Sequence, residues 1–273
     1  MIIAFDLDGS LLNSKKAISP LTLKVLSLLK NQGHILIPCT GRSLQGLPAE
    51  LLTPGFCDYA ILSNGAIIYD MQKQATLFTS CFTSEEFAKI IDLLTPYKVD
   101  IDYNADGQVF SDRYSIEHLD RYHIQPELLP MIKRSRTIVE DIKEDVVDNK
   151  RQVNRANIFF EDLALRSQLF AQKETLPFDL TTSVPHNGEI TKKGINKGFG
   201  IKYMCQHLQL PLDQVMFFGD ADNDKEALAL DINSVLMCNG NDELKQVAKQ
   251  ITAWDNDHDG LAKYLINYFK LSI

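Results

Sequence analysis

The sequence is poor in cysteine and lacks any long apolar segment. Its five cysteines are odd in number, lie scattered along 273 residues and form no C-x-x-C pair. This pattern argues against a disulfide framework or a zinc site, and it fits a reducing compartment. No apolar run approaches the ~18 residues of a membrane span. The N-terminus also lacks the basic segment and long apolar segment of a signal peptide. We therefore expect a cytoplasmic protein.

The sequence also has fewer basic than acidic residues. The chain has 28 lysines and arginines against 36 aspartates and glutamates, a formal net charge of -8. A net negative charge argues against nucleic acid and anionic membranes as partners. The hydrophobic content of 45% is ordinary for a globular protein. We expect a small-molecule ligand, no nucleic-acid or membrane partner, and a monomer or homodimer.

Both ends of the chain alternate between apolar strands and amphipathic helices. The strands are expected at residues 1–5, 35–39, 59–62, 215–218 and 234–237. The helices are expected at about residues 20–32, 43–52, 222–230, 241–249 and 259–270. Continuous apolar strands that alternate with helices are typical of a parallel sheet with both faces covered.

The middle of the chain, residues 83–186, has a different pattern. Residues 99–103 alternate between apolar and polar side chains, and Asp106-Gly107 is typical of a hairpin turn. We interpret the charged stretch 133–151 as a solvated helical surface with loops.

These patterns together predict an α/β fold with two parts. Residues 1–82 and 187–273 are expected to form a doubly wound, Rossmann-like core with a parallel sheet. Residues 83–186 are expected to form an inserted α+β domain.

Four polar segments lie at the ends of the predicted core strands or at the start of a helix. They are Asp6-Leu7-Asp8-Gly9-Ser10, Thr40-Gly41-Arg42, Asn196-Lys197 and the run from Gly219 to Asp224. Parallel strands bring their carboxyl ends to one edge of a sheet, which is where ligands bind in α/β folds. Each segment alone has a plainer interpretation as a turn, a helix cap or a solvated lysine, so the prediction depends on their combination.

The combination indicates phosphoryl-transfer chemistry. Four aspartates, Asp6, Asp8, Asp220 and Asp224, would crowd negative charge unless a cation neutralised it. Their donors are all oxygens, which favours a hard cation with Mg²⁺ first. A hydroxyl, an ammonium and an amide beside the metal would make a phosphate cradle, and one carboxylate would serve as nucleophile. These three groups belong to Thr40, Lys197 and Asn223.

The same segments resemble the haloacid dehalogenase-like hydrolase superfamily, in particular its Cof-type sugar-phosphate phosphatases. The resemblance covers essentially the whole chain, and it implies that residues 83–186 are a cap that sets substrate specificity. It implies that Asp6 is the nucleophile and Asp8 the acid and base. It implies an Mg²⁺ site made of Asp6, the carbonyl of Asp8, and Asp220. Asp224 would position Lys197 or metal-bound water.

The resemblance also implies residues that bind the phosphoryl group or the substrate. These are Leu7, Thr40, Gly41, Lys197 and Asn223, with Arg42 directed toward the cap side. Within the cap, the candidate specificity residues are Tyr103, Asp106, Asp112, Arg113, His118, His123, Arg155, Asn157 and His186. For His118 and His123 a role as hydrogen-bonding surface or partly buried histidines is favoured over a ligand role. For Glu189, shortly before Lys197, two interpretations stay open: a contact with a substrate hydroxyl, or a turn cap.

The expected function is that of a Mg²⁺-dependent phosphatase that hydrolyses small phosphorylated metabolites, with sugar phosphates as the subclass, through an aspartyl-phosphate. Two alternatives stay open: a phosphomutase, and a metabolite-binding regulatory protein with little turnover. A dehalogenase would need neither the metal nor the acid. A glycosyltransferase would leave Thr40, Lys197 and Asp220 unexplained.

Overall fold

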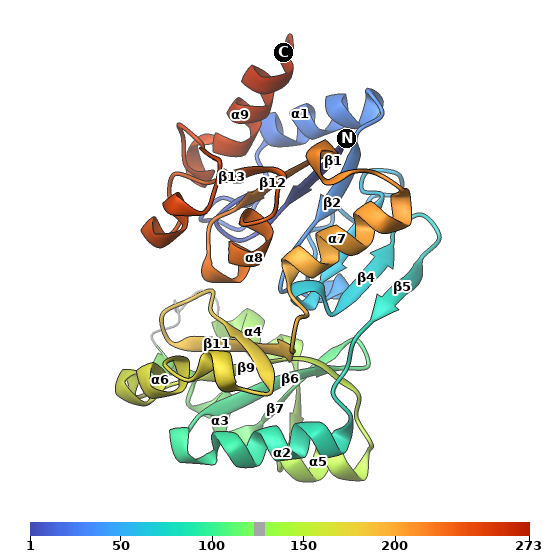
Figure 1. Ribbon diagram of the computed structural model, residues 1–273. Helices are drawn as coiled ribbons and strands as arrows, with labels where there is room; N and C mark the ends of the chain where they lie inside the picture. Colours follow the sequence, from blue (N-terminus) through green and yellow to red (C-terminus); the bar gives the residue numbers. More distant parts are fainter. Residues whose placement is uncertain (123–128) are drawn as a thin grey trace. The chain divides into compact units, whose positions relative to one another are not determined.

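The computed structural model describes residues 1–122 and 129–273, which form two compact units (Figure 1). Unit 1 comprises Met1–Phe78 and Ile195–Ile273, and unit 2 comprises Thr79–Gly194. We expected the boundaries after residues 82 and 186. Both lie elsewhere because Phe82 forms a bridge with Val153 of unit 2, and strand β11 (Asn187–Lys192) pairs with two unit 2 strands.

Unit 1 contains a five-stranded, all-parallel sheet in the order β14-β13-β12-β1-β2. The strands are β1 (Ile2–Phe5), β2 (Ile35–Pro38), β12 (Val215–Gly219), β13 (Asn233–Leu236) and β14 (Gln250–Ile251). Sequence neighbours such as β1 and β2 are joined by a helix, which gives the predicted doubly wound topology. The predicted fold class is therefore confirmed.

Helices cover both faces of this sheet because alternate side chains of each strand point to opposite sides. Ile3 and Phe5 pack with helices α1 (Pro20–Asn31) and α9 (Gly260–Phe269). Ile2 and Ala4 pack with α7 (Lys197–Leu208) and α8 (Lys225–Leu228) on the other face. Helix α1 begins as its sequence predicts, with the Ser19 side chain accepting a hydrogen bond from the amide of Thr22 at 3.0 Å.

A small antiparallel sheet completes unit 1. It consists of β3 (Tyr59–Leu62), β4 (Ile67–Asp70) and β5 (Ala75–Thr79), in that order. One bridge, between Cys39 and Ile61, links β3 to the end of β2. The helix that we expected over residues 43–52 is wrong: only the 3₁₀ turn Leu44–Gly46 forms there. Pro48 has no amide hydrogen to donate and its ring obstructs an α-helix at this point.

Unit 2 contains a six-stranded sheet in the order β10-β11-β9-β6-β7-β8. Its strands are β6 (Asp100–Ala105), β7 (Gln108–Asp112), β8 (Arg136–Val139), β9 (Val153–Phe159), β10 (Phe178–Thr181) and β11. The β6–β7 hairpin turns at Asp106-Gly107, as predicted. Strand β8 lies in the stretch that we interpreted as helices and loops, and it pairs in parallel with β7.

Helices pack against one face of this second sheet. Helices α2 (Ser84–Leu94), α5 (Ile142–Asp148) and α6 (Leu163–Phe170) contribute to a core with the apolar side chains of β6 and β9. Two shorter helices, α3 (Arg113–Glu117) and α4 (Leu129–Ser135), complete the unit. Across both units, none of the described helices is long and apolar enough to cross a membrane.

Candidate active site

Two of the predicted site residues, Asp6 and Asp220, directly follow the neighbouring strands β1 and β12. These strands pair in parallel, with Phe5 opposite Phe218, and the amide of Asp6 donates to the carbonyl of Phe218 at 2.8 Å. Asp6 and Asp220 therefore emerge side by side at the carboxyl edge of the sheet, as expected.

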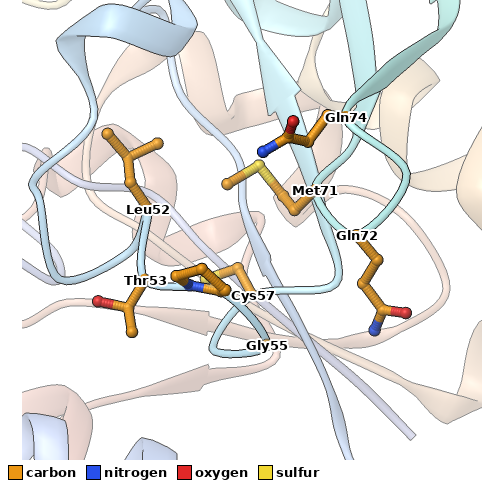
Figure 2. A pocket seen from close by; sticks show the side chains of 8 residues that line it. Leu52, Thr53, Gly55, Cys57, Met71, Gln72 and Gln74 are labelled. Carbon is orange, nitrogen blue, oxygen red and sulfur yellow. The ribbon is translucent and has the colours of Figure 1, made fainter.

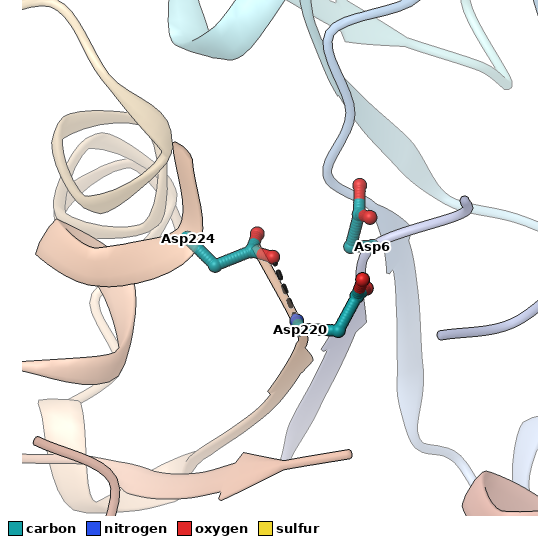
Figure 3. A group of neighbouring side chains, drawn as sticks. All are labelled: Asp6, Asp220 and Asp224. Carbon is teal, nitrogen blue, oxygen red and sulfur yellow. Dashed lines mark hydrogen bonds between the residues drawn. The ribbon is translucent and has the colours of Figure 1, made fainter. Parts of the chain in front are cut away.

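Three aspartates form what we call the acidic cluster: Asp6, Asp220 and Asp224 (Figure 3). Each offers one carboxylate oxygen, and these oxygens lie within 4.8 Å of one another. Lys197, at the start of α7, reaches the cluster with its Nζ 2.7 Å from Asp6 Oδ1 and 2.6 Å from Asp224 Oδ1. The Lys197 side chain is completely buried, so it is an internal counter-charge rather than a solvated lysine.

The acidic cluster holds more negative charge than Lys197 balances. Burial raises the pKa of Asp6 well above its usual range; Lys197 opposes this rise, and Asp224 and Asp220 add to it. Burial and the charge of Asp224 likewise raise the pKa of Asp220 to about 7. Burial disfavours the Lys197 charge, but the pKa of Lys197 is raised because Asp224 and Asp6 outweigh that effect. A further cation would relieve this imbalance.

Asp224 differs from the other two aspartates because protein donors occupy both of its oxygens. Oδ1 accepts the Lys197 ammonium, and Oδ2 accepts the amide of Ala221 at 3.0 Å. Oδ2 also accepts the amide of Asp220 at 2.8 Å, the dashed line in Figure 3. In contrast, Asp6 Oδ2 accepts no hydrogen bond from any residue that the structure describes. The geometry therefore suits Asp224 to hold Lys197 and the Asp220 loop in place. Asp6 keeps its Oδ2 available for a metal ion or a substrate.

Asp8 lies outside the acidic cluster and is held by two cations. Arg42 donates from Nε to Asp8 Oδ2 at 2.8 Å and from an Nη to Oδ1 at 2.7 Å, and Lys16 donates at 2.7 Å. Burial acts to raise the pKa of Asp8, but the bonds and charges of Arg42 and Lys16 lower it to about 2. Arg42 also donates to the carbonyl of Gly46. The resemblance implied that Arg42 is directed toward the cap side; its contact with Asp8 was not among the expectations.

The other predicted phosphate contacts lie around the same strand ends. The hydroxyl oxygen of Thr40 accepts the amide of Arg42 at 3.2 Å, so its hydrogen is left to donate. The side chain of Leu7 is buried in the core, so only its backbone could contact a ligand. The side-chain amide of Asn223 donates to Asn64 Oδ1 at 3.4 Å.

The turn Ser63–Gly65 has an unusual backbone conformation next to the Thr40 loop. All three residues have a positive φ, at 49°, 54° and 96°. The amides of Ser63 and Asn64 donate to the carbonyls of Arg42 and Thr40, which ties this turn to the Thr40 loop. A Cβ atom on Gly65 would lie 2.3 Å from the carbonyl oxygen of Asn196, so the chain approaches the start of α7 closely here.

Sequence reasoning missed the role of Ser10. Its hydroxyl donates to Asp220 Oδ1 at 2.7 Å, over a separation of 210 residues. The position of Ser10 two residues after Asp8 was the available signal, because the strand-end argument that joined Asp6 to Asp220 applies to it as well.

In unit 2, several predicted substrate contacts have structural partners. Tyr103 is buried in the core and its hydroxyl bonds to Asp145, which removes it as a ligand contact. Arg155 pairs with Glu189 at 2.6 Å and donates to Asn157 at 2.7 Å, so these three form one group. His123 lies outside the described residues. The remaining predicted contacts each have a hydrogen-bond partner within unit 2. The pairs are Asp106 with Arg151, Asp112 with Ser115, Arg113 with Glu140, His118 with the carbonyl of Tyr114, and His186 with the carbonyl of Phe160.

A pocket in unit 1 is separate from the acidic cluster (Figure 2). Its volume is about 250 Å³, and its lining includes Leu52, Cys57, Met71 and Gln74. These residues precede β3 or follow β4, at the opposite end of the hairpin from the Ser63–Gly65 turn. The pocket contains none of the predicted catalytic residues.

The family model of the haloacid dehalogenase-like hydrolases matches residues 3–265. The chain belongs to this family. The acidic cluster and Lys197 are therefore features of a haloacid dehalogenase-like hydrolase, and the expected Cof-type membership is confirmed.

Relatives with curated names agree with this assignment. The chain is 30% identical to a 5-amino-6-(5-phospho-D-ribitylamino)uracil phosphatase, YitU, of Bacillus subtilis, over 99% of this chain and 98% of the relative. It is 27% identical to an HMP-PP phosphatase of Serratia proteamaculans, over 98% of this chain and 95% of the relative. The expected enzyme class, a phosphoric monoester hydrolase, is confirmed at the level of the family and of these relatives.

A solved structure shows the same fold. A haloacid dehalogenase-like hydrolase from B. subtilis superposes with a TM-score of 0.83 at 22% identity, over 97% of this chain and 98% of that chain.

Proposed function

We propose that this chain is a Mg²⁺-dependent phosphatase that hydrolyses small phosphorylated metabolites through an aspartyl-phosphate on Asp6. The observation that carries the proposal is the acidic cluster at the edge of the sheet: the buried carboxylates of Asp6 and Asp224 share the single ammonium of Lys197, and the half-buried carboxylate of Asp220 lies beside them. Family membership supports the reaction class.

The residues present fit Mg²⁺. Lys197 balances one of the three negative charges of the acidic cluster, and a divalent cation would balance the other two. The donors are all oxygens, as Mg²⁺ prefers. Asp6, Asp220 and the backbone carbonyl of Asp8 would hold the ion; the turn hydrogen bonds that follow β1 end on the carbonyls of Asp6 and Leu7 and not on that of Asp8. When bound, Mg²⁺ supplies charge neutralisation for the phosphoryl oxygens.

Asp6 is the proposed nucleophile. Lys197 holds Asp6 Oδ1, and Oδ2 would attack phosphorus, so that the bond from phosphorus to the leaving oxygen breaks as the Asp6–phosphorus bond forms. Thr40, the Gly41 amide, Lys197 and Asn223 would bind the phosphoryl oxygens as hydrogen-bond donors. Asp224 would keep Lys197 and the Asp220 loop in position through the contacts described above.

Asp8 is the proposed acid and base. It would give a proton to the leaving alkoxide, and its carboxylate would then take a proton from the water that hydrolyses the aspartyl-phosphate. In the structure Arg42 and Lys16 favour the ionised form, which suits the second step. The first step requires that Arg42 and Lys16 leave Asp8, and an incoming anionic phosphate ester offers Arg42 another partner.

The substrate class is proposed to be sugar phosphates or related polyol phosphates. The B. subtilis relative is named for a substrate with a phosphorylated ribityl chain. Unit 2 is proposed to be the cap that selects the organic part of the substrate. Its group of the buried Arg155 and Glu189 and the half-buried Asn157 offers paired donors and acceptors of the kind that bind hydroxyl groups.

The test is hydrolysis of p-nitrophenyl phosphate by the purified full chain. We expect phosphate release with Mg²⁺ and its loss in EDTA. In Asp6→Asn, kcat should fall by at least about a thousandfold, since removal of a nucleophile has effects of this size or larger. Asp222→Asn is the matched control because Asp222 lies in the same loop as Asp220 but outside the acidic cluster, and it should retain activity.

A panel of sugar phosphates then separates the alternatives. The phosphatase releases inorganic phosphate, whereas a phosphomutase would return an isomerised ester with little free phosphate. Tight binding without turnover across the panel would indicate the regulatory protein. Full activity in Asp6→Asn would refute the assignment of the nucleophile.

A further inference from the structure

Ser10 and Gly9 together enclose the carboxylate of Asp220. The Ser10 side chain is buried, and its hydroxyl donates to Asp220 Oδ1 at 2.7 Å. Gly9 has φ +87°, and a Cβ atom built on it would lie only 2.2 Å from Asp220 Oδ2. Any other residue at position 9 would therefore displace this carboxylate.

A second segment, the turn after β13, contacts the backbone of both Gly9 and Asp220. The side-chain amide of Asn239 donates to the carbonyl of Gly9 at 2.8 Å, and the amide of Asn241 donates to the carbonyl of Asp220 at 2.8 Å. The turn after β13 thus fastens the loop after β1 to the loop after β12. Neither asparagine was among the residues that the sequence singled out.

We propose that Ser10 is a positioning residue for the metal: its hydroxyl orients the Asp220 carboxylate so that Asp220 and Asp6 can share one divalent cation. This inference rests on the proposed metal site. It also gives the turn after β13 a role in the metal site, because Asn239 donates to the carbonyl of Gly9 and so fixes the backbone that carries the Ser10 hydroxyl.

The physical reason is that a carboxylate can rotate unless something outside the metal fixes it. Ser10 occupies a lone pair of Oδ1 and selects one orientation before the ion arrives, so less freedom is lost on binding. Partners of this kind commonly change metal affinity by about 10–100-fold when they are removed. Ser10 does not touch the proposed reacting atoms, so its loss should weaken the metal site more than it slows turnover at saturating metal.

The test measures metal binding directly, in the full chain without substrate. Free Mn²⁺ is followed by its electron paramagnetic resonance signal, and Mg²⁺ is then added as competitor. We expect Ser10→Ala to raise the dissociation constants of both ions by about tenfold. Ser10→Thr keeps the hydroxyl and should restore an affinity within a fewfold of the wild type.

Ser234→Ala is the matched control. Ser234 is a buried serine of β13 whose hydroxyl oxygen accepts the amide of Lys249 at 3.0 Å, outside the acidic cluster. It should bind both ions as the wild type does. If Ser10→Ala fails to fold, Ser10→Cys keeps the volume with a weaker donor and should lose affinity in the same direction.

Equal affinity in Ser10→Ala and wild type would overturn the inference while leaving the proposed phosphatase intact. An equal loss in Ser10→Thr and Ser10→Ala would also overturn it, because the hydroxyl would then not be the cause. A wild type that binds neither Mn²⁺ nor Mg²⁺ would refute the metal site itself, and with it the Mg²⁺ dependence of the proposed function.

Discussion

At the scale of single residues, the contact between Asp8 and Arg42 determines which protonation state Asp8 adopts. The planar guanidinium donates to both oxygens of the carboxylate, a geometry that a lysine could not reproduce. Burial alone would raise the pKa of Asp8, so its low value depends on Arg42 and Lys16. The proposed acid step therefore needs a rearrangement of Arg42, and this can be measured.

We predict that Arg42→Ala raises the pKa of Asp8 from about 2 toward or above the usual value of an aspartate. A carboxyl whose pKa is lowered by folding stabilises the protein above its unfolded pKa, and this contribution disappears as the pH falls toward 2. The variant should lose the part of that contribution that Arg42 supplies, while Lys16 still contacts Asp8. The measurement is a ¹³C carboxyl titration of the metal-free protein by nuclear magnetic resonance.

Arg42→Lys is the control for this measurement. It keeps the charge but loses the two parallel hydrogen bonds, so the pKa of Asp8 should rise by a smaller amount. An unchanged Asp8 titration in Arg42→Ala would show that Arg42 does not set its ionisation.

The sequence was informative about Asp6, Asp8 and Lys197 because each directly follows a strand or opens a helix. Regular elements carry such residues to a common edge whatever the details of the loops. The partner of Asp8 could not be predicted in this way. Arg42 is 34 residues distant in sequence, and its side-chain direction depends on the loop that follows β2.

At the scale of elements, the Ser63–Gly65 turn connects the loop after β2 with the start of α7. Left-handed backbone at Ser63 and Asn64 costs free energy that the surrounding hydrogen bonds must offset. Gly65 permits a close approach to the carbonyl of Asn196, whose own side chain caps α7 by accepting the amide of Phe199. The position of Lys197 thus depends on a turn more than a hundred residues earlier.

We predict that Gly65→Ala destabilises the protein more than Gly33→Ala does. Gly33 has a similar φ of 85° but no atom within 4 Å of a built Cβ, so it reports the backbone cost alone. That cost is about 1 kcal/mol or more. Gly65→Ala adds a clash between the new methyl group and the carbonyl of Asn196. It should also lower kcat, because Lys197 is the residue after Asn196 and would be displaced with it.

Thermal unfolding of both variants measures this difference. In a chain of this size, each kcal/mol corresponds to a shift in Tm of about 2–4 °C. Equal shifts in the two variants would mean that the Asn196 contact relaxes without cost.

The elements that sequence reasoning misplaced have local causes. We expected a helix over residues 43–52 because we gave more weight to the spacing of its apolar residues than to Pro48, which interrupts an α-helix. Strand β8 has the exposed Ile138 and lies between short helices, so its four residues carry too weak an alternation to be recognised. Its parallel pairing with β7 is a tertiary contact that no local pattern encodes.

At the scale of the whole molecule, the alternation of strands and helices was enough to predict the parallel core and the inserted unit. The predicted boundaries between the two units were less accurate. Strand β11 (Asn187–Lys192) has a polar sequence and lies shortly before the Lys197 helix, so we interpreted it as a segment that leads back into the core. The cytoplasmic location and the monomeric or dimeric state stay predictions.

The acidic cluster also couples the stability of the whole fold to pH. The pKa of Asp220 is raised to about 7 by burial and by the charge of Asp224. A carboxyl whose pKa is raised by folding stabilises the fold fully only below its unfolded pKa, and this contribution is lost as the pH rises through the folded pKa. The metal-free protein should therefore lose stability between about pH 4 and pH 7 on account of Asp220.

We predict that Asp220→Asn flattens this pH dependence, because an amide cannot ionise. The metal-free variant should have a higher Tm than the wild type near pH 8, whereas Asp242→Asn, at an exposed carboxylate, should not. Saturating Mg²⁺ should raise the Tm of the wild type, since a ligand that binds only the folded state stabilises it. It should raise the Tm of Asp220→Asn far less. A metal-free Asp220→Asn with the same steep decline in Tm as the wild type would show that Asp220 does not carry the excess charge of the cluster.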